Sequence, residues 1–150
     1  MARIVVAEDD ADIRHLVTQL LVDEGHEVSA FWDGDIAVDK LLEDPPELLI
    51  LDIMMPGLDG YSVIEELRDN GVLSAIKVMV LSARSSEQDF QKSYQLGAFA
   101  HVTKPFDPDE LVGRVTELLV LSKDELRARR EKERERAYLL SQLESIFNDG

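Results

Sequence analysis

Hydrophobic and polar positions alternate in two recurring patterns along the chain, through roughly residue 121. Short runs of branched apolar residues predict buried strands. The segment after each run has apolar residues three and four positions apart, which is the spacing of one helix face. Ile13, Leu16, Val17, Leu20 and Leu21 form the first such face. The predicted strands are 3–7, 27–31, 47–51, 76–83 and 99–103, and the alternation in 27–31 is typical of a less buried strand.

Turn and capping residues mark the ends of the expected helices. A helix over 35–44 stops at Pro45-Pro46, and a helix over 89–98 has Gly97 as its C-terminal cap. The helix over 107–121 starts with an Asp-Pro pair, an N-cap followed by a first-position proline. Strands that alternate with helices predict an α/β fold, a doubly wound, five-stranded parallel sheet with right-handed crossovers.

Polar side chains follow the strands at the edge of the sheet where function is usually found. Glu8-Asp9-Asp10 come after the first strand, Asp52 after the third, Ser82 ends the fourth and Lys104 follows the fifth. Carboxylates this close together repel one another unless a cation intervenes. Carboxylate ligands suit Mg²⁺. With Mg²⁺ and Lys104 to balance charge and Ser82 as a hydrogen-bond donor, Asp52 is predicted to be a nucleophile that accepts a phosphoryl group.

The sequence resembles the receiver domains of two-component response regulators over roughly residues 2–121. The resemblance is carried by four motifs in order, "AEDD", "LDIMMPGLDG", "LSA" and "TKPF", each at the end of a predicted strand. It implies the CheY-like and flavodoxin-like strand order 2-1-3-4-5. It also implies that Asp52 is phosphorylated by a phosphohistidine on a sensor histidine kinase or phosphotransfer protein.

The resemblance also implies a metal site and a phosphoryl contact. Asp9 would ligate Mg²⁺ directly and Glu8 through water, with Asp52 and the backbone carbonyl of Met54 as further ligands. Lys104 would contact the phosphoryl group, and the bond from Lys104 to the following proline is expected to be cis.

The family's switch is a hydroxyl that moves toward the phosphoryl group and an aromatic residue that turns inward behind it. Ser82 and His101 occupy these positions, and a histidine there would make the switch sensitive to pH. The alternative for His101 is a partly exposed strand residue. Asp10 is expected to cap the first helix, and His15 is expected to lie on the surface of that helix.

Charge and composition exclude several classes of function. A formal net charge of −15 argues against non-specific binding to nucleic acid and against docking to anionic membranes. Because the chain contains no cysteine, it has neither disulfides nor a thiolate metal site. No apolar run has the length of a signal peptide or of a transmembrane segment, so a cytoplasmic location is expected.

The division expected is a receiver domain over 1–121 and a charged helical extension over 122–150. The extension is helical by propensity. Leu119, Leu126, Leu140 and Phe147 fall on a seven-residue repeat that Glu133 interrupts. We expect a long helix that dimerises, as a coiled coil or as a linker to an effector domain.

Three arrangements of the extension compete. A helix continuous with the preceding one would run about 60 Å from Pro108 to Phe147, at 1.5 Å per residue. A capping box of Ser122 and Glu125 would begin a separate helix instead. The third arrangement is a disordered tail.

The function expected is a phosphorylation switch that catalyses only its own phosphorylation and dephosphorylation. It would form a homodimer through the C-terminal helix, through the face of the fourth helix, fifth strand and fifth helix, or through both. Three alternatives remain. An FMN carrier would suffer repulsion between its phosphate and residues 8–10, and a haloacid-dehalogenase-like phosphatase would need a second aspartate where Met54 lies. The third is a truncated regulatory part of a larger effector enzyme such as a nucleotide cyclase.

Overall fold

The structure is a computed structural model that describes residues 1–148. The chain divides into two compact units, Met1–Val120 and Leu121–Gly150. The first unit holds the sheet and all the residues of the candidate site, and the second holds one helix.

The sheet of the described residues has five parallel strands in the order β2-β1-β3-β4-β5, which confirms the predicted α/β fold and strand order. The central strand, β3, is buried along its whole length, whereas β2 lies at an edge and is partly exposed, as its alternating pattern predicted. The strands are β1 Arg3–Ala7, β2 Glu27–Phe31, β3 Leu48–Asp52, β4 Lys77–Ser82 and β5 Ala100–Thr103.

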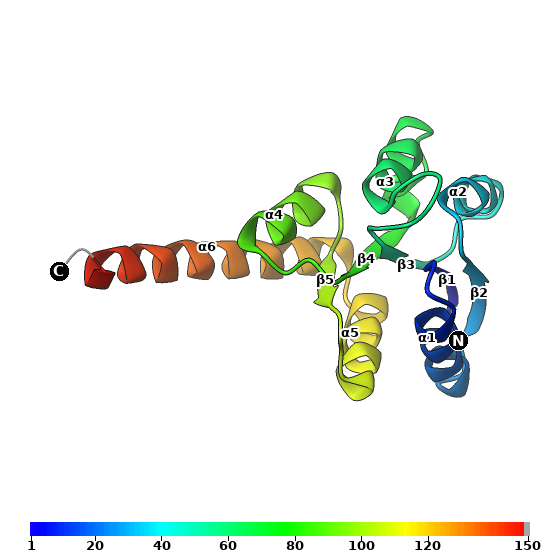
Figure 1. Ribbon diagram of the computed structural model, residues 1–150, viewed down its shortest axis with the longest axis horizontal. Helices are drawn as coiled ribbons and strands as arrows, with labels where there is room; N and C mark the ends of the chain where they lie inside the picture. Colours follow the sequence, from blue (N-terminus) through cyan, green and yellow to red (C-terminus); the bar gives the residue numbers. More distant parts are fainter. Residues whose placement is uncertain (149–150) are drawn as a thin grey trace. The chain divides into compact units, whose positions relative to one another are not determined.

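Helices cover both faces of the sheet, with α1 and α5 on one side and α2, α3 and α4 on the other (Figure 1). Alternate residues of each strand pack against the two helical layers, so Val5 and Ala7 join the cluster built with α2 and α3. The helices of this unit are α1 Ala11–Asp23, α2 Gly34–Glu43, α3 Gly60–Asp69, α4 Glu87–Leu96 and α5 Pro108–Val120, with a short 3₁₀ turn, η1, at Leu73–Ala75.

Side-chain caps fix where the helices start. Asp10 accepts hydrogen bonds from the backbone amides of Asp12 and Ile13, which confirms it as the N-cap of α1. Helix α4 starts at Glu87, two residues before the predicted 89, because Ser86 and Asp89 form a capping box. This box was readable in the sequence as a serine followed three residues later by an acid.

The apolar face predicted for α1 is wider than the face of this helix that is buried in the fold. Val17 and Leu21 are fully buried, but Leu16 is 43% exposed, so its assignment to the packed face was wrong. A helix that rests on one side against a sheet buries a narrow stripe, and Leu16 lies at the margin of that stripe.

The second unit contains α6, Lys123–Asn148, which is separated from the end of α5 by Leu121 and Ser122. The amide of Glu125 donates to Ser122 Oγ at 3.1 Å, and the amide of Ser122 donates to Glu125 Oε1 at 3.3 Å. The capping box therefore forms, so of the three competing arrangements the separate helix is the one found over Lys123–Asn148, and the continuous helix from Pro108 is excluded. Positions 149 and 150 of the predicted extension lie outside the described residues.

Across residues 1–148, none of the helices combines the length and the apolar character needed to cross a lipid bilayer.

Candidate functional site

Asp52 ends the buried central strand, and two glycines shape the loop that follows it. Asp52 is 4% exposed, and its backbone pairs with Leu81 of β4. Gly57 has a φ of 74°, a left-handed conformation that favours glycine. A Cβ on Gly60 would lie 2.4 Å from the carbonyl oxygen of Asp52, so only glycine lets α3 begin this close to the end of β3.

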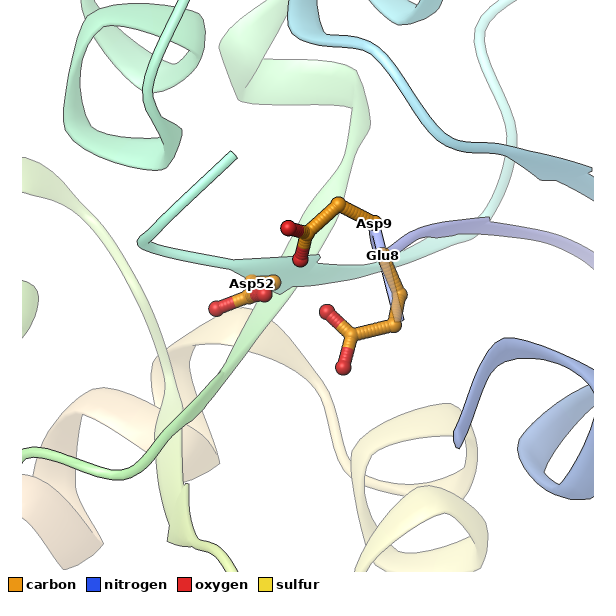
Figure 2. A group of neighbouring side chains, drawn as sticks. All are labelled: Glu8, Asp9 and Asp52. Carbon is orange, nitrogen blue, oxygen red and sulfur yellow. The ribbon is translucent and has the colours of Figure 1, made fainter. Parts of the chain in front are cut away.

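Glu8 and Asp9 reach toward Asp52 from the end of the neighbouring strand β1 (Figure 2). One ligand atom from each of the three carboxylates lies within 4.8 Å of the other two. Glu8 is fully buried and Asp9 is exposed, so the cluster has a protein side and a solvent side.

Lys104 supplies the positive charge of the site. Its Nζ atom lies 2.5 Å from Glu8 Oε1 and 3.3 Å from Asp52 Oδ2. The peptide bond from Lys104 to Pro105 is cis, as the resemblance implied. A lysine between two buried carboxylates leaves the cluster with an excess of negative charge, since Asp9 adds a third.

Burial and contact between the carboxyl groups shift the pKa values of Glu8 and Asp52 in opposite directions. Burial, followed by hydrogen bonding with Asp52, raises the pKa of Glu8 to about 8, against the opposing effect of Lys104. Burial also acts to raise the pKa of Asp52, but hydrogen bonds from the Glu8 carboxyl and from the Met54 amide, at 3.0 Å, lower it overall. Asp52 is therefore the ionised partner, which is the form a nucleophile needs.

The donor set fits a hard divalent cation. Glu8 Oε2 is buried, and no hydrogen-bond donor of the described residues reaches it, so this oxygen needs either a proton shared with Asp52 or a cation. Three carboxylates in reach of one point match the oxygen ligands that Mg²⁺ prefers. Met54 borders the cluster with its amide on Asp52, while its side chain is 58% exposed.

Ser82 ends β4, the strand that pairs with β3, and a chain of hydrogen bonds joins it through His101 to α4. The amide of Arg84 donates to Ser82 Oγ at 3.0 Å, and the carbonyl oxygen of Arg84 lies 2.8 Å from His101 Nε2. His101 Nδ1 lies 2.8 Å from Ser93 Oγ, and the ring packs edge-on against Phe90. A carbonyl can only accept, so Nε2 carries the proton and Nδ1 accepts from Ser93.

His101 is thus a buried residue, 6% exposed, and not the partly exposed strand residue of the alternative. Burial lowers the pKa of His101, although its hydrogen bond with Arg84 opposes the shift. The ring is neutral at neutral pH, which matches the tautomer that its two partners require.

The structure brings the predicted residues Glu8, Asp9, Asp52 and Lys104 into direct reach of one another. Ser82 ends the strand next to β3, whereas the His101 ring faces α4. His15 is exposed on α1, as predicted. Sequence reasoning missed Arg84 and Ser93, and for Ser93 the only available signal was a small polar residue on the apolar side of α4.

The parallel 2-1-3-4-5 sheet, with an acidic cluster and a lysine at the carboxyl ends of its strands, defines a CheY-like receiver fold. Residues 4–116 match the family of response regulator receiver domains. The chain belongs to this family.

Among its relatives is the phosphate regulon transcriptional regulatory protein PhoB of Escherichia coli, 40% identical over 113 residues that make up 75% of this chain and 49% of PhoB. The chain therefore spans about half the length of the curated relatives it matches.

Solved receiver domains share this fold. The Francisella response regulator 1452 receiver domain has a TM-score of 0.74 and 29% identity, covering 79% of this chain and 97% of that one. The beryllofluoride-activated N-terminal receiver domain of Klebsiella pneumoniae RstA has a TM-score of 0.72 and 28% identity, covering 79% and 99%.

Proposed function

We propose that this receiver domain accepts a phosphoryl group on Asp52 from a phosphohistidine of a sensor histidine kinase or phosphotransfer protein, with Mg²⁺ as the metal. The observation that carries the proposal is the pairing of an ionised, buried Asp52 with Lys104 at 3.3 Å inside a three-carboxylate cluster. Burial of charged side chains costs free energy, and such burial is expected at a site that binds charged groups.

The reaction is a transfer between two covalent partners. An oxygen of Asp52 attacks phosphorus, the bond from phosphorus to the histidine nitrogen breaks, and its electron pair returns to the imidazole. Hydrolysis reverses the state when water attacks phosphorus and the Asp52 carboxylate leaves. No independent substrate is involved, so the domain is a switch and not an enzyme acting on other molecules.

Several groups would stabilise the transferred phosphoryl group. Glu8, Asp9, Asp52 and the carbonyl of Met54 would hold Mg²⁺, which supplies charge neutralisation when bound. Lys104 is close enough to Asp52 to reach an oxygen of the new phosphoryl group after releasing one carboxylate. Ser82 would donate its hydroxyl proton to another oxygen, which it can do without losing the hydrogen bond that it accepts from Arg84.

The switch would run through the hydrogen bonds that join Ser82 to α4. If Ser82 moves toward the phosphoryl group, the Arg84 amide moves with it, and the Arg84 carbonyl pulls on His101. His101 and Ser93 then change the position of α4 relative to β5, the face expected to bind a partner.

We also propose that α6 pairs with α6 of a second copy. Leu139, Leu140, Leu143, Ile146 and Phe147 are exposed and lie within about 120° of one face of the helix, at 3.6 residues per turn. A stripe of this kind on a helix with few other apolar residues is typical of a coiled-coil seam. The face of α4, β5 and α5 remains a second candidate for association.

Direct phosphorylation tests the central proposal. The protein with Mg²⁺ and acetyl phosphate should gain the mass of one phosphoryl group, and chelation of Mg²⁺ should abolish the gain. Asp52→Asn should stay unmodified, whereas Asp59→Asn, a matched change at the exposed N-cap of α3, should be modified normally. Modification of the Asp52→Asn variant would contradict the assignment. Beryllofluoride, present on the RstA receiver domain, serves as a stable phosphoryl mimic.

The cytoplasmic location and the absence of nucleic-acid binding stay predictions from the sequence. PhoB is a transcriptional regulator by name, but this chain matches about half of its length, so that activity is not carried over. Nothing in the fold or in the relatives supports the nucleotide cyclase alternative.

A further inference from the structure

The loop that carries the acidic pair is held through its backbone by a residue that sequence motifs do not single out. Arg14, in the first turns of α1, donates from Nη1 to the carbonyl oxygen of Glu8 at 2.9 Å and to that of Asp9 at 3.2 Å. The amide of Glu8 donates to the carbonyl oxygen of Phe31 at 2.9 Å. The backbone of Glu8 is therefore fixed on its amide side by β2 and on its carbonyl side by α1.

Arg14 is in turn held by an exposed tryptophan. The guanidinium carbon of Arg14 lies 5.7 Å from the centroid of the Trp32 ring, within the range of a cation–π contact. Trp32 directly follows β2 and is 56% exposed, so its ring is not explained by packing in the core.

We propose that Arg14, oriented by Trp32, is a positioning residue that sets the direction of the Glu8 and Asp9 carboxylates toward Asp52. The inference rests on the proposed function, since it concerns the Mg²⁺ ligands of that site. Arg14 contacts carbonyl oxygens, so it fixes the two peptide planes from which the acidic side chains emerge. Mg²⁺ tolerates little deviation from octahedral geometry, so a small rotation of either plane weakens binding.

Geometry and charge can be separated by two substitutions. Arg14→Lys keeps the positive charge but loses the planar group that directs two N–H bonds while stacking on Trp32. Arg14→Gln loses both. Arg68→Lys is the matched control, because Arg68 of α3 also donates to a backbone carbonyl, that of Leu96, away from the site.

The measurement is the Mg²⁺ dissociation constant of the full chain by isothermal titration calorimetry. Arg14→Lys and Arg14→Gln should both weaken binding roughly tenfold, as is typical for residues that orient metal ligands, and Arg68→Lys should bind like the wild type. Trp32→Leu should weaken binding in the same direction by a smaller factor. Arg14→Lys with wild-type affinity would overturn the inference, whether or not Arg14→Gln binds weakly, because charge alone would then explain Arg14.

A second readout needs no metal. Trp32 is the single tryptophan of the chain, so its fluorescence reports the contact with Arg14 directly. In metal-free protein, acrylamide should quench Trp32 more strongly in both Arg14 variants than in the wild type or in Arg68→Lys. Unchanged quenching would show that Trp32 does not orient Arg14. If the wild type itself binds no Mg²⁺, both the proposed function and this inference fail. If the wild type and Arg14→Lys bind Mg²⁺ equally well, only this inference fails.

Discussion

At the scale of single residues, the site depends on how Glu8, Asp9, Asp52 and Lys104 share charge in a mostly buried space. Lys104 contacts both buried carboxylates, and Glu8 holds its proton far above the ordinary pH range of a glutamate. The result is an ionised carboxylate at Asp52, the form that the proposed nucleophile needs, beside a glutamate whose pKa is raised.

This charge arrangement predicts how the stability of the metal-free protein depends on pH. The pKa of Glu8 rises from 4.5 to about 8 on folding, so its contribution is complete below pH 4.5 and is lost as the pH rises through about 8. The free energy of unfolding in EDTA should fall by about 1 kcal/mol between pH 7 and pH 9. Urea denaturation measures it, and the fall should disappear in Glu8→Gln. The same fall in the free energy of unfolding of Glu8→Gln would show that another titrating group causes it.

Gly60 gives a second test at this scale. Because its missing Cβ would lie 2.4 Å from the Asp52 carbonyl oxygen, Gly60→Ala must displace either α3 or the end of β3. We expect a loss of about 1–3 kcal/mol in the free energy of unfolding. Gly113→Ala is the matched control: nothing lies within 4 Å of its Cβ, and it sits in α5, so it should be stabilising by up to about 1 kcal/mol. Equal changes in the free energy of unfolding for Gly60→Ala and Gly113→Ala would show that α3 and the end of β3 can move apart without a cost in stability.

At the scale of elements, the hydrogen bonds from Ser82 to α4 join the site to the face on which receivers are expected to signal. Each step is a bond between neighbouring elements: β4 to its following loop, that loop to β5, and β5 to α4. This continuity supports the proposal that a movement of one hydroxyl at the site reaches a helix at the surface.

Ser93→Ala breaks the last bond and leaves His101 Nδ1 buried without its donor. The variant should lose about 1–2 kcal/mol of stability, the usual cost of an unpaired buried polar group. Ser85→Ala, an exposed serine before α4, should change stability by less than about 0.5 kcal/mol. Because the Arg84 carbonyl still holds the Nε2 proton, the tautomer should stay the same, but the Nδ1 chemical shift of His101 should move as its hydrogen bond is lost, and only in Ser93→Ala. An unchanged Nδ1 shift in Ser93→Ala would contradict the bond from Ser93.

The capping box of α6 predicts a local effect of Ser122. Ser122→Ala removes the acceptor for the Glu125 amide and should destabilise the start of α6 by about 1 kcal/mol. Backbone chemical shifts should show fraying over the first turn after Lys123, with the receiver unit unchanged. A first turn as helical as in the wild type would mean that other interactions hold it.

At the scale of the whole molecule, the proposed output is a change in association. The receiver unit supplies a switch, and α6 supplies an apolar stripe with no core of its own among the described residues. Helix α5 ends at Val120 and α6 begins at Lys123. We propose that a change in the receiver unit alters the pairing of α6.

Light scattering with Mg²⁺, with and without beryllofluoride, tests this output. The wild type should associate in at least one state, and Leu140→Asp should be a monomer in both, because it places a charge in the seam. Ser141→Asp adds the same charge to the opposite side of the helix and should behave like the wild type. Association that survives Leu140→Asp would assign the interface to α4, β5 and α5.

The sequence by itself determined the alternation of strands and helices, the strand order through family resemblance, and the acidic, hydroxyl and lysine side chains at the strand ends. These follow from local periodicity and from which residue types a phosphoryl site requires. Only the tertiary structure decided which carboxyl keeps its proton, that His101 is buried between Ser93 and Arg84, and that Arg14 holds the acidic loop. It also decided between a continuous and a separate C-terminal helix. Burial and these hydrogen-bond partners depend on how strands and helices pack together, so the periodicity of a single segment does not encode them. The capping box of Ser122 and Glu125 was a local pattern, but it left a continuous helix open.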